Sequence, residues 1–587
     1  MTRRPALLLL AILSALALTG CVRLPQDGPV RTIAAENPGD ADALVDYTPG
    51  GPKPGSAPVP LVDNFLAAMT ATPLNTFVAR EFLASESGRS WVPEQGTVAY
   101  GSHRLVSEPG GRVRLVLGDV VELDDRGTWL GDPTRGRGLS YDLRLVRENG
   151  EWRISRPPNR LLVPRTHFDT EYQPYMLYFF EKSAQVLVPE PVYVPRGLQA
   201  PTMLVAGLLK GPARNLRGVE RTFFPPSTSL DGISVPVSRD GTAEVPLSDA
   251  VLDVDDQQLS LLFAQIAWTL SQIPGVERIR VTVNGTPVDL GGTSVDVRVG
   301  SWSEFDPAVA WASTALFGLR DGRVVAVTNG KEESVGGPFG RAPLGLRSIG
   351  VDLPAQHVAG VTSDGTRVLE SAMNATPGQS QVRTVYAGTD VLCPVYDLYG
   401  QVWILDRTAS GARLAVVRAG VPRDVQVPGL SGHAVVRMVL SRDGTRLVAQ
   451  LRENGRDSLV ISRVERDHRG RVRRVSPATP LPLPGEGGAV IHGLAWRTPS
   501  SVAVLVSPSS GASQLLAVKV DGSAAPEEVN TNAEVFRDDA LRLVTSPAVG
   551  APLYIGTANG QLFSLASTGR WTGTNIRPGL VAPVFVG

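Results

Sequence analysis

Residues 255–276 read DDQQLSLLFAQIAWTLSQIPGV, and this stretch decides the fold of the middle of the chain. Apolar side chains recur at helical spacing on one face of the segment 259–273, namely Leu259, Leu262, Phe263, Ile266, Leu270 and Ile273. Asp255 or Asp256 can cap the start of such a helix, and Pro274-Gly275 ends it. The stretch therefore predicts an amphipathic helix with one buried face.

Strand patterns lie on both sides of this helix. A second helix is predicted over 203–209, where Gly211-Pro212 stops it. Apolar and β-branched residues predict four strands, over 192–194, 233–237, 243–247 and 278–283. Together these patterns predict an α+β domain over residues 169–305.

Length and composition set the broad class. The chain has 587 residues, of which 42% are hydrophobic and 19% charged, as expected for a globular chain of about four domains. Lys+Arg and Asp+Glu are both 57, so the formal net charge is zero, which argues against a dedicated nucleic-acid binder. The 61 Gly and 47 Pro indicate many turns and a β-rich architecture.

The N-terminus carries an export signal. Arg3 and Arg4 precede an uncharged run from Pro5 to Leu18, which is too short to span a bilayer and is typical of a signal-peptide core. The run ends in Leu18-Thr19-Gly20-Cys21, which resembles the bacterial lipobox. The resemblance implies a signal peptide over 1–20 and acylation of Cys21. We expect stable anchoring to the cell membrane through the acyl chains, on its extracytoplasmic face.

A linker and a first domain follow the anchor. Residues 21–60 are rich in Gly and Pro and are predicted to form the lipidated cysteine and a linker. Residues 61–168 change character, with helical spacing over 61–69 and 75–83 and strand patterns over 113–117, 120–123, 139–146 and 152–155. Helices followed by a curved antiparallel sheet resemble the NTF2-like fold, for which we favour a binding or spacer role over catalysis.

The C-terminal part repeats weakly. VTSDGTRV at 361–368 is similar to VLSRDGTRL at 439–447, and each pairs a polar turn with a strand. At roughly 40–50 residues per blade, residues 306–587 are predicted to form a β-propeller of about five or six blades. One or two β-sandwiches are the alternative.

Three motifs of the middle domain are more specific. LLKGP at 208–212, DGTAEV at 240–245 and TLSQIPGV at 269–276 resemble the GerMN domain, an interaction or ligand-binding module. The order of lipobox, linker, NTF2-like segment, GerMN-like domain and propeller resembles the actinobacterial LpqB lipoprotein family. That resemblance implies that the protein binds the ectodomain of the sensor kinase MtrB and modulates the MtrA–MtrB two-component system, with an effect on cell-wall homeostasis and cell division.

No catalytic or metal-binding pattern is convincing in the sequence, so we expect no enzyme activity, no catalytic residues, no metal and no cofactor. The six histidines never fall within four residues of one another, as zinc-ligand spacing would require: His103, His167, His357, His433, His468 and His492. Asp-Gly pairs at 240, 364, 443 and 521 lack the further acidic residues of a calcium loop and predict turns. Cys393 precedes Pro394 in an apolar stretch and predicts a buried, inert thiol.

One basic run stands out, over residues 463–474. Its arginines predict either a solvated hairpin or a contact for a polyanion or an acidic partner face: Arg463, Arg466, Arg469, Arg471, Arg473 and Arg474.

Three hypotheses of function follow. The first is a non-enzymatic lipid-anchored modulator of a sensor kinase, which closed domains with an exposed apolar patch would support. The second is a receptor for a peptidoglycan fragment or glycolipid, which a deep aromatic cavity in the NTF2-like or GerMN-like domain would support. The third is a propeller hydrolase or lactonase, which acidic and histidine ligands with a metal at the propeller axis would support.

Overall fold

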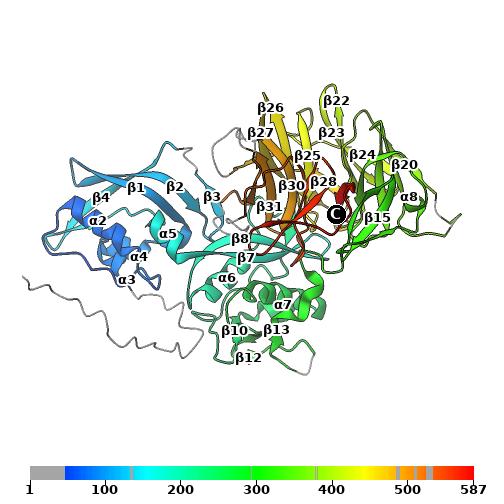
Figure 1. Ribbon diagram of the computed structural model, residues 1–587. Helices are drawn as coiled ribbons and strands as arrows, with labels where there is room; N and C mark the ends of the chain where they lie inside the picture. Colours follow the sequence, from blue (N-terminus) through cyan, green and yellow to red (C-terminus); the bar gives the residue numbers. More distant parts are fainter. Residues whose placement is uncertain are drawn as a thin grey trace, which may run out of the picture. The chain divides into compact units, whose positions relative to one another are not determined.

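The computed structural model describes residues 47–587 except for 133–135, 292–293, 377, 380, 484–489, 508–511 and 524–532. The predicted signal peptide and the residues Leu18, Thr19, Gly20 and Cys21 lie outside the described residues. Residues 47–587 form one compact unit, which Figure 1 colours from blue to red. Within the described ranges, no helix combines the length and the apolar character that a membrane span needs.

The first region places short helices against a sheet (Figure 1). The helices are α2 (Pro58–Ala68), α3 (Phe77–Glu81), α4 (Ser85–Ser90) and the 3-10 helix η2 (Pro93–Gln95). The sheet has the order β5-β4-β2-β1-β6, with β3 paired to β2. Its strands are β1 (Thr97–Glu108), β2 (Arg112–Leu123), β3 (Trp129–Gly131), β4 (Leu139–Glu148), β5 (Glu151–Ile154) and β6 (Leu161–Pro164).

The core of this region lies between the helices and one face of the sheet. Phe65 of α2 contacts Phe82 and Trp91, and all three side chains are buried. The predicted helices are present, although α3 is shorter than the segment 75–83. The predicted strands are present too, but those over 113–117 and 120–123 form the single strand β2. Tyr47 pairs with Thr72, so this end of the predicted linker is part of the folded unit. The likeness to the NTF2-like fold stays a prediction.

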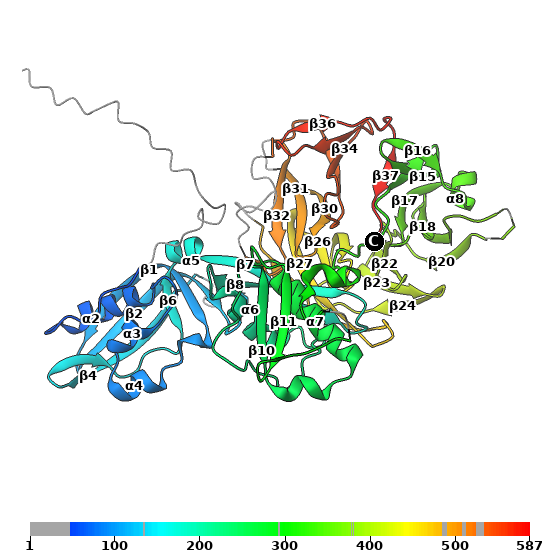
Figure 2. The ribbon, with the colours of Figure 1, turned by 90° about the horizontal axis from the view of Figure 1, so that it is seen from below.

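The middle region contains two sheets with the orders β8-β7-β9 and β10-β11-β12, and β13 pairs with β11. Because β10 and β11 are parallel, a crossover must join them, and α7 provides it. The elements are α5 (Arg165–Glu171), β7 (Tyr172–Glu181), β8 (Leu187–Pro195), α6 (Ala200–Leu209), β9 (Glu220–Arg221), β10 (Thr242–Leu247), η3 (Asp249–Asp253), α7 (Asp256–Leu270), β11 (Arg278–Val283), β12 (Thr286–Pro287), β13 (Val297–Arg298) and η4 (Val299–Phe305). Figure 2 shows α6 and α7 beside β10 and β11.

Helix α7 carries the core of this region, as its sequence predicts. The Asp255 side chain accepts a hydrogen bond from the backbone N–H of Gln258 at 2.8 Å, so Asp255 is the N-cap. The strand predicted over 233–237 is wrong, because this segment is a loop with a single bridge from Val237 to Ala243 and Ile233 is 99% exposed. Alternating apolar residues predicted that strand, but the backbone N–H of Val235 bonds instead to Thr202 Oγ1.

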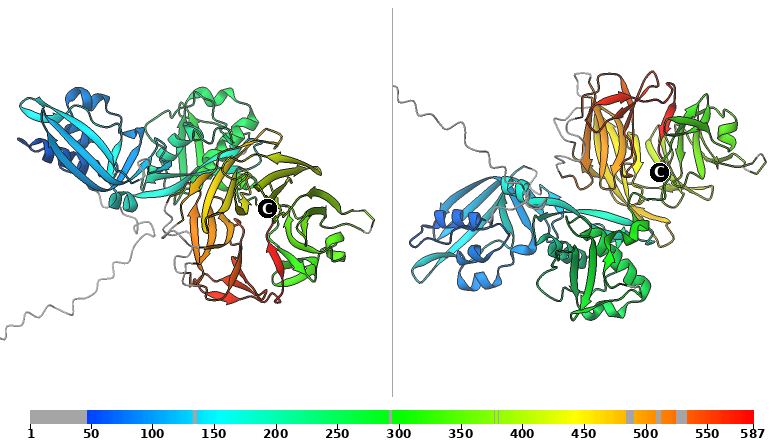
Figure 3. Two further views of the ribbon diagram at one scale, coloured as in Figure 1. Left: turned by 90° about the horizontal axis from the view of Figure 1, so that it is seen from above. Right: turned by 60° about the horizontal axis from the view of Figure 1, so that its bottom comes forward.

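The C-terminal region consists of antiparallel sheets. Among the described residues six sheets follow one another, with the orders β16-β15-β14-β37, β17-β18-β19-β20, β21-β22-β23-β24, β25-β26-β27-β28 with β29 on β27, β30-β31-β32 and β33-β34-β35-β36. Strand β37 returns to pair with β14, so the last strand of the region completes its first sheet. Figure 3 shows these sheets around a common centre.

The bounds of these elements are β14 (Leu316–Arg320), β15 (Arg323–Thr328), β16 (Lys331–Ser334), α8 (Pro338–Arg341), β17 (Leu346–Val351), β18 (His357–Thr362), β19 (Arg367–Ala372), β20 (Arg383–Ala387), β21 (Val395–Tyr396), β22 (Val402–Thr408), β23 (Gly411–Arg418), β24 (Val421–Val425), β25 (Val435–Leu440), β26 (Arg446–Glu453), β27 (Arg456–Arg466), β28 (Val472–Val475), β29 (Thr479–Leu481), β30 (Val490–Thr498), β31 (Ser501–Ser507), β32 (Gln514–Lys519), β33 (Ala540–Val544), β34 (Tyr554–Thr557), β35 (Leu562–Leu565), β36 (Trp571–Gly573) and β37 (Val581–Val584).

The two similar segments do not occupy equivalent places. The turn of 361–368 joins β18 to β19, the second and third strands of one sheet, whereas the turn of 439–447 joins β25 to β26, the first and second strands of another. An Asp-Gly turn with flanking hydroxyl residues fits any hairpin of a β-rich region. Its recurrence therefore identifies turns, but it does not show where one blade ends and the next begins.

Candidate functional site

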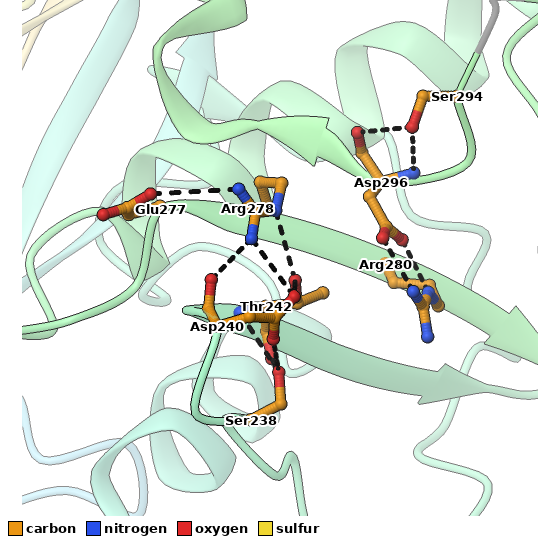
Figure 4. Close-up of polar contacts among 8 residues, drawn as sticks. All are labelled: Ser238, Asp240, Thr242, Glu277, Arg278, Arg280, Ser294 and Asp296. Atoms are coloured by element: carbon orange, nitrogen blue, oxygen red, sulfur yellow. Dashed lines mark hydrogen bonds and ion pairs between the residues drawn. The ribbon is translucent and has the colours of Figure 1, made fainter.

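Polar side chains gather at one end of β10 and β11 in the middle region (Figure 4). Arg278 Nη2 donates to the carbonyl oxygen of Asp240 at 2.5 Å and to its Oδ2 at 3.1 Å, and Arg278 Nε donates to Thr242 Oγ1 at 3.3 Å. Hydrogen bonds from Ser238, Arg278 and Thr242 lower the pKa of the Asp240 carboxyl to about 2. These bonds hold the Asp240-Gly241 turn, where Gly241 has φ +78°, and leave the carboxylate no evident proton-transfer role.

A second pair lies on the same sheet, between Arg280 of β11 and Asp296, which directly precedes β13. Arg280 donates from Nε and Nη2 to the two carboxylate oxygens of Asp296 at 2.6 and 2.7 Å (Figure 4). The hydrogen bond from Arg280 is the main cause that lowers the pKa of Asp296. The pair ties β11 to the segment before β13. Within the described ranges, no cluster of His, Cys, Asp and Glu side chains could hold a metal ion.

The basic run of residues 463–474 is divided by the fold. Arg466 is buried, its Nη2 lies 2.8 Å from Asp397 Oδ2, and its guanidinium lies over the Tyr399 ring. Burial lowers the pKa of Arg463 to about 10. These two arginines of β27 therefore face protein and are withdrawn from the surface contact that the sequence suggests.

The other four arginines of the run are exposed. Arg471 and Arg474 form ion pairs with Asp467 at 2.7 Å and with Glu465 at 2.5 Å. For the side chains of Arg469 and Arg473, no ion-pair partner is found in the described part of the chain. The free positive charge on this hairpin is thus smaller than the sequence implies.

A buried ionic cluster that the sequence does not predict joins the three regions. Its first half is Arg126, which follows β2, and Glu190 of β8. Arg126 Nη2 lies 2.7 Å from Glu190 Oε2, and Glu190 is 1% exposed. Arg126 Nη1 also donates to the carbonyl oxygen of Gly211 at 2.7 Å, and Glu190 Oε1 accepts from the backbone N–H of Ala213 at 3.0 Å.

The second half of the cluster belongs to β26. Arg446 is 1% exposed. Its Nη2 donates to the carbonyl oxygen of Pro189 at 2.5 Å and lies 3.9 Å from Glu220 Oε1, and its Nη1 donates to Asp443 Oδ2 at 3.0 Å. The residues of this cluster therefore tie β8 and β9 to the C-terminal sheets on one side and to the first region on the other.

The Glu220 carboxyl provides a pH test of this cluster. Burial and the neighbouring Glu190 raise the pKa of Glu220 well above its ordinary value of 4.5. The folded protein therefore holds this proton more tightly than the unfolded chain does, so its contribution to stability is full at low pH and is lost as the pH rises above about 4.5. We expect Glu220→Gln to flatten the fall in stability by up to about 1.4 kcal/mol per pH unit.

Urea unfolding of both proteins between about pH 5 and pH 8 measures this slope. Glu304→Gln, at an exposed glutamate, is the matched control and should keep the wild-type slope. Equal slopes for wild type and Glu220→Gln would contradict the assignment.

Three family models match successive parts of the chain. They are "Lipoprotein LpqB, N-terminal domain" over residues 51–169, "Sporulation and spore germination" over 176–289, and "Lipoprotein LpqB beta-propeller domain" over 322–573. Together with the fold, these matches define a multidomain chain with a GerMN-like domain and an all-β region of the propeller class. Two of the three matched models describe domains of LpqB lipoproteins.

Curated relatives show the same similarity along nearly the whole chain. The chain is 26% identical to "Lipoprotein LpqB" of Thermobifida fusca over 95% of both chains, and 28% identical to that of Mycobacterium bovis over 99% of both. Among solved structures, the first GerMN domain of the sporulation protein GerM from Bacillus subtilis aligns with 22% of this chain and 97% of its own, with 21% identity and a TM-score of 0.19.

Proposed function

We propose that the protein is a non-enzymatic lipoprotein, anchored by acyl chains on Cys21 to the extracytoplasmic face of the cell membrane, that modulates the MtrA–MtrB two-component system. Its partner is the ectodomain of the sensor kinase MtrB, and its effect falls on cell-wall homeostasis and cell division. The observation that supports this proposal best is the match to LpqB lipoproteins over nearly the full length of the chain.

The coupling requires differential affinity. A lipoprotein shifts the kinase between signalling states only if it binds one state more tightly than the other. Candidate contacts are Leu198, Ile233 and Leu252 of the GerMN-like region, which are large, apolar and exposed. The exposed arginines of the basic hairpin, Arg469 and Arg473, would suit an acidic face of the partner.

Calorimetric titration tests the proposal. The full-length protein in phosphatidylcholine nanodiscs is titrated with the purified MtrB ectodomain, without and with muropeptides. Saturable binding to the ectodomain alone is the expected result, and Ile233→Asp should weaken it by about tenfold if the GerMN-like loop lies in the contact. Arg423→Gln, on the exposed strand β24, is the control variant. Absence of heat in both titrations would overturn direct contact.

The alternative is a receptor for an envelope ligand such as a peptidoglycan fragment or glycolipid. One observation favours it, a cavity of about 740 Å³ among the C-terminal sheets, although the expected places were the NTF2-like and GerMN-like domains. Heat that appears only with muropeptides would favour this alternative. The hydrolase hypothesis gains no support, because the described residues that line this cavity contribute no acidic side chain.

A further inference from the structure

The cavity of about 740 Å³, which we call the channel, is lined by residues from all six C-terminal sheets. Each sheet contributes the strand at its inner edge or the residues beside it, namely β17, β21, β25, β30, β33 and β37. A cavity of this volume falls in the range of sites that enclose one small molecule. The ring of inner strands, together with residues that flank these strands, therefore forms a walled site.

The ionisable side chains of the channel wall are almost all cationic. They are Arg347, Arg407, Arg437, Arg442, Arg542, His492 and the thiol Cys393, and no acidic side chain occurs among the described residues that line the cavity. The Cys393 thiol donates to the carbonyl oxygen of Ile349 at 3.1 Å, and its enclosed position raises its pKa to about 11. The thiol is thus exposed to the channel, where the sequence predicts a buried one, and it stays protonated and inert.

Acidic residues just outside the wall neutralise only part of this charge. Asp390 accepts hydrogen bonds from both Arg347, at 2.6 Å, and Arg407. Two guanidinium groups therefore share one carboxylate, which leaves a net positive charge at this side of the channel.

Arg437 has less compensation. Its Nη1 donates to the carbonyl oxygen of His492 at 2.8 Å. The nearby Asp457 already forms a two-bond pair with Arg452, at 2.7 Å for each bond. Burial lowers the pKa of Arg437, and Arg542 and Arg452 lower it further, as expected where positive charge accumulates.

Arg542 is the channel arginine with the least compensation of its charge. It is exposed, and within the described residues its side chain has neither a hydrogen-bond nor an ion-pair partner. His492 experiences the same field, since burial and then Arg437 and Arg452 lower the pKa of its ring. The wall on the side of β25, β30 and β33 thus carries two arginines, Arg437 and Arg542, that form no ion pair with any described residue.

Unpaired donors give a second, independent observation. Arg442 is 6% exposed and donates from Nη1 to the carbonyl oxygen of Ala308 at 2.8 Å, but its Nε and Nη2 have no partner. Burial lowers the pKa of Arg442 to about 10, and the negative charge of Asp306 offsets only part of this shift. The two side chains do not form an ion pair. The indole Nε1 of Trp496 and the hydroxyl of Ser348 also lack partners.

All three of these residues line the channel. Arginine and tryptophan side chains can only donate hydrogen bonds, and buried donors without partners are rare in folded proteins. The unpaired nitrogen atoms of Arg442 and Trp496 therefore favour a ligand that offers acceptor oxygens. Arginine forks match the planar geometry of carboxylate and phosphate groups.

The rest of the wall is apolar, with side chains such as Met438, Leu494 and Phe585. We propose that this channel binds a small organic oxyanion, whose phosphate or carboxylate group lies against Arg437, Arg442 and Arg542 and whose apolar body contacts the wall beside Trp496. The proposal gives a chemical class to the ligand of the receptor alternative, and it is independent of kinase binding.

Ligand-observed NMR with the full-length protein in phosphatidylcholine nanodiscs tests the proposal. The probes are phenyl phosphate, benzoate and the uncharged phenol. Saturable binding of one or both anions is expected, at least about tenfold tighter than binding of phenol, because only the anions can accept charge-assisted hydrogen bonds from the arginines with a full negative charge. Phosphate and carboxylate preference is read from the two anions directly. Equal binding of phenol, or no binding of either anion, would overturn the proposal.

Two variants locate the site. The double variant Arg437→Gln/Arg542→Gln removes the two positive charges that have no ion-pair partner among the described residues. It should weaken anion binding by at least about tenfold, while phenol binding stays unchanged. Trp496→Phe keeps the ring face and removes the Nε1 donor, and it should weaken anion binding by a few-fold. Arg423→Gln, an exposed arginine on the outer strand β24, should bind as wild type does. Wild-type anion binding by the double variant would place the anion elsewhere and overturn the proposal, whatever the outcome of the kinase titration.

Discussion

Replacement of Cys21 by alanine should abolish attachment of lipid to the protein. In our proposal the thiol of Cys21, at the end of the stretch Leu18-Thr19-Gly20-Cys21, forms the thioether to the lipid, and alanine offers no nucleophile for this bond. We expect the wild-type chain to incorporate an alkyne-labelled fatty acid and to begin at Cys21. The variant should show no label and should keep residues 1–20. Gel fluorescence and mass spectrometry of the N-terminal peptide measure both effects.

The chain offers a matched control, because its second cysteine is Cys393. Cys393→Ala should retain the full label, since this thiol lies in the C-terminal region, where it donates to Ile349. Label that persists in Cys21→Ala and disappears in Cys393→Ala would contradict the assignment of the anchor.

Replacement of Arg446 by methionine should destabilise the protein by about 3–5 kcal/mol, the usual effect of removing one partner from a buried ion pair. Arg446 donates to Pro189 and Asp443 and lies near Glu220. The variant leaves the buried Asp443 carboxylate without its cation and the Pro189 carbonyl without this donor. Urea unfolding, followed by tryptophan fluorescence, measures the loss.

Arg413→Met is the control for this prediction. Arg413 of β23 pairs with Asp424 at 2.8 Å, and both side chains are about half exposed, so its removal should cost about 0–1 kcal/mol. If both variants lost the same stability, the buried cluster would contribute no more than a surface pair.

The elements that local patterns encode were predictable. The periodicity of 259–273 and its acidic cap predict α7, and Asp255 caps the helix in the structure. Strand β8 (Leu187–Pro195) was predicted only over 192–194, because every position of this strand is buried and its sequence therefore lacks the alternation that marks a half-exposed strand. In 233–237 the alternation is present, but the backbone N–H of Val235 bonds to a side chain and not to a neighbouring strand. Here the pattern predicted a strand that the structure does not contain.

Sites made of buried arginines could not be predicted in the same way. A sequence pattern treats arginine as a surface residue, whereas Arg442, Arg446 and Arg466 are buried. Arg437 and Arg542 belong to strands of different sheets, β25 and β33, and only the tertiary arrangement brings them to one wall. The GerMN-like motifs, by contrast, are contiguous in the chain and were recognisable from the sequence.

The pairing of β37 with β14 also determines the order in which the channel can be completed. These strands stand at opposite ends of the C-terminal region, so the first sheet keeps an unsatisfied edge until β37 is in place. Closing so long a loop carries an entropic cost that local hairpins do not have. We therefore expect ring closure to be a late event of folding, and a chain cut short before β37 to expose a strand edge prone to aggregation.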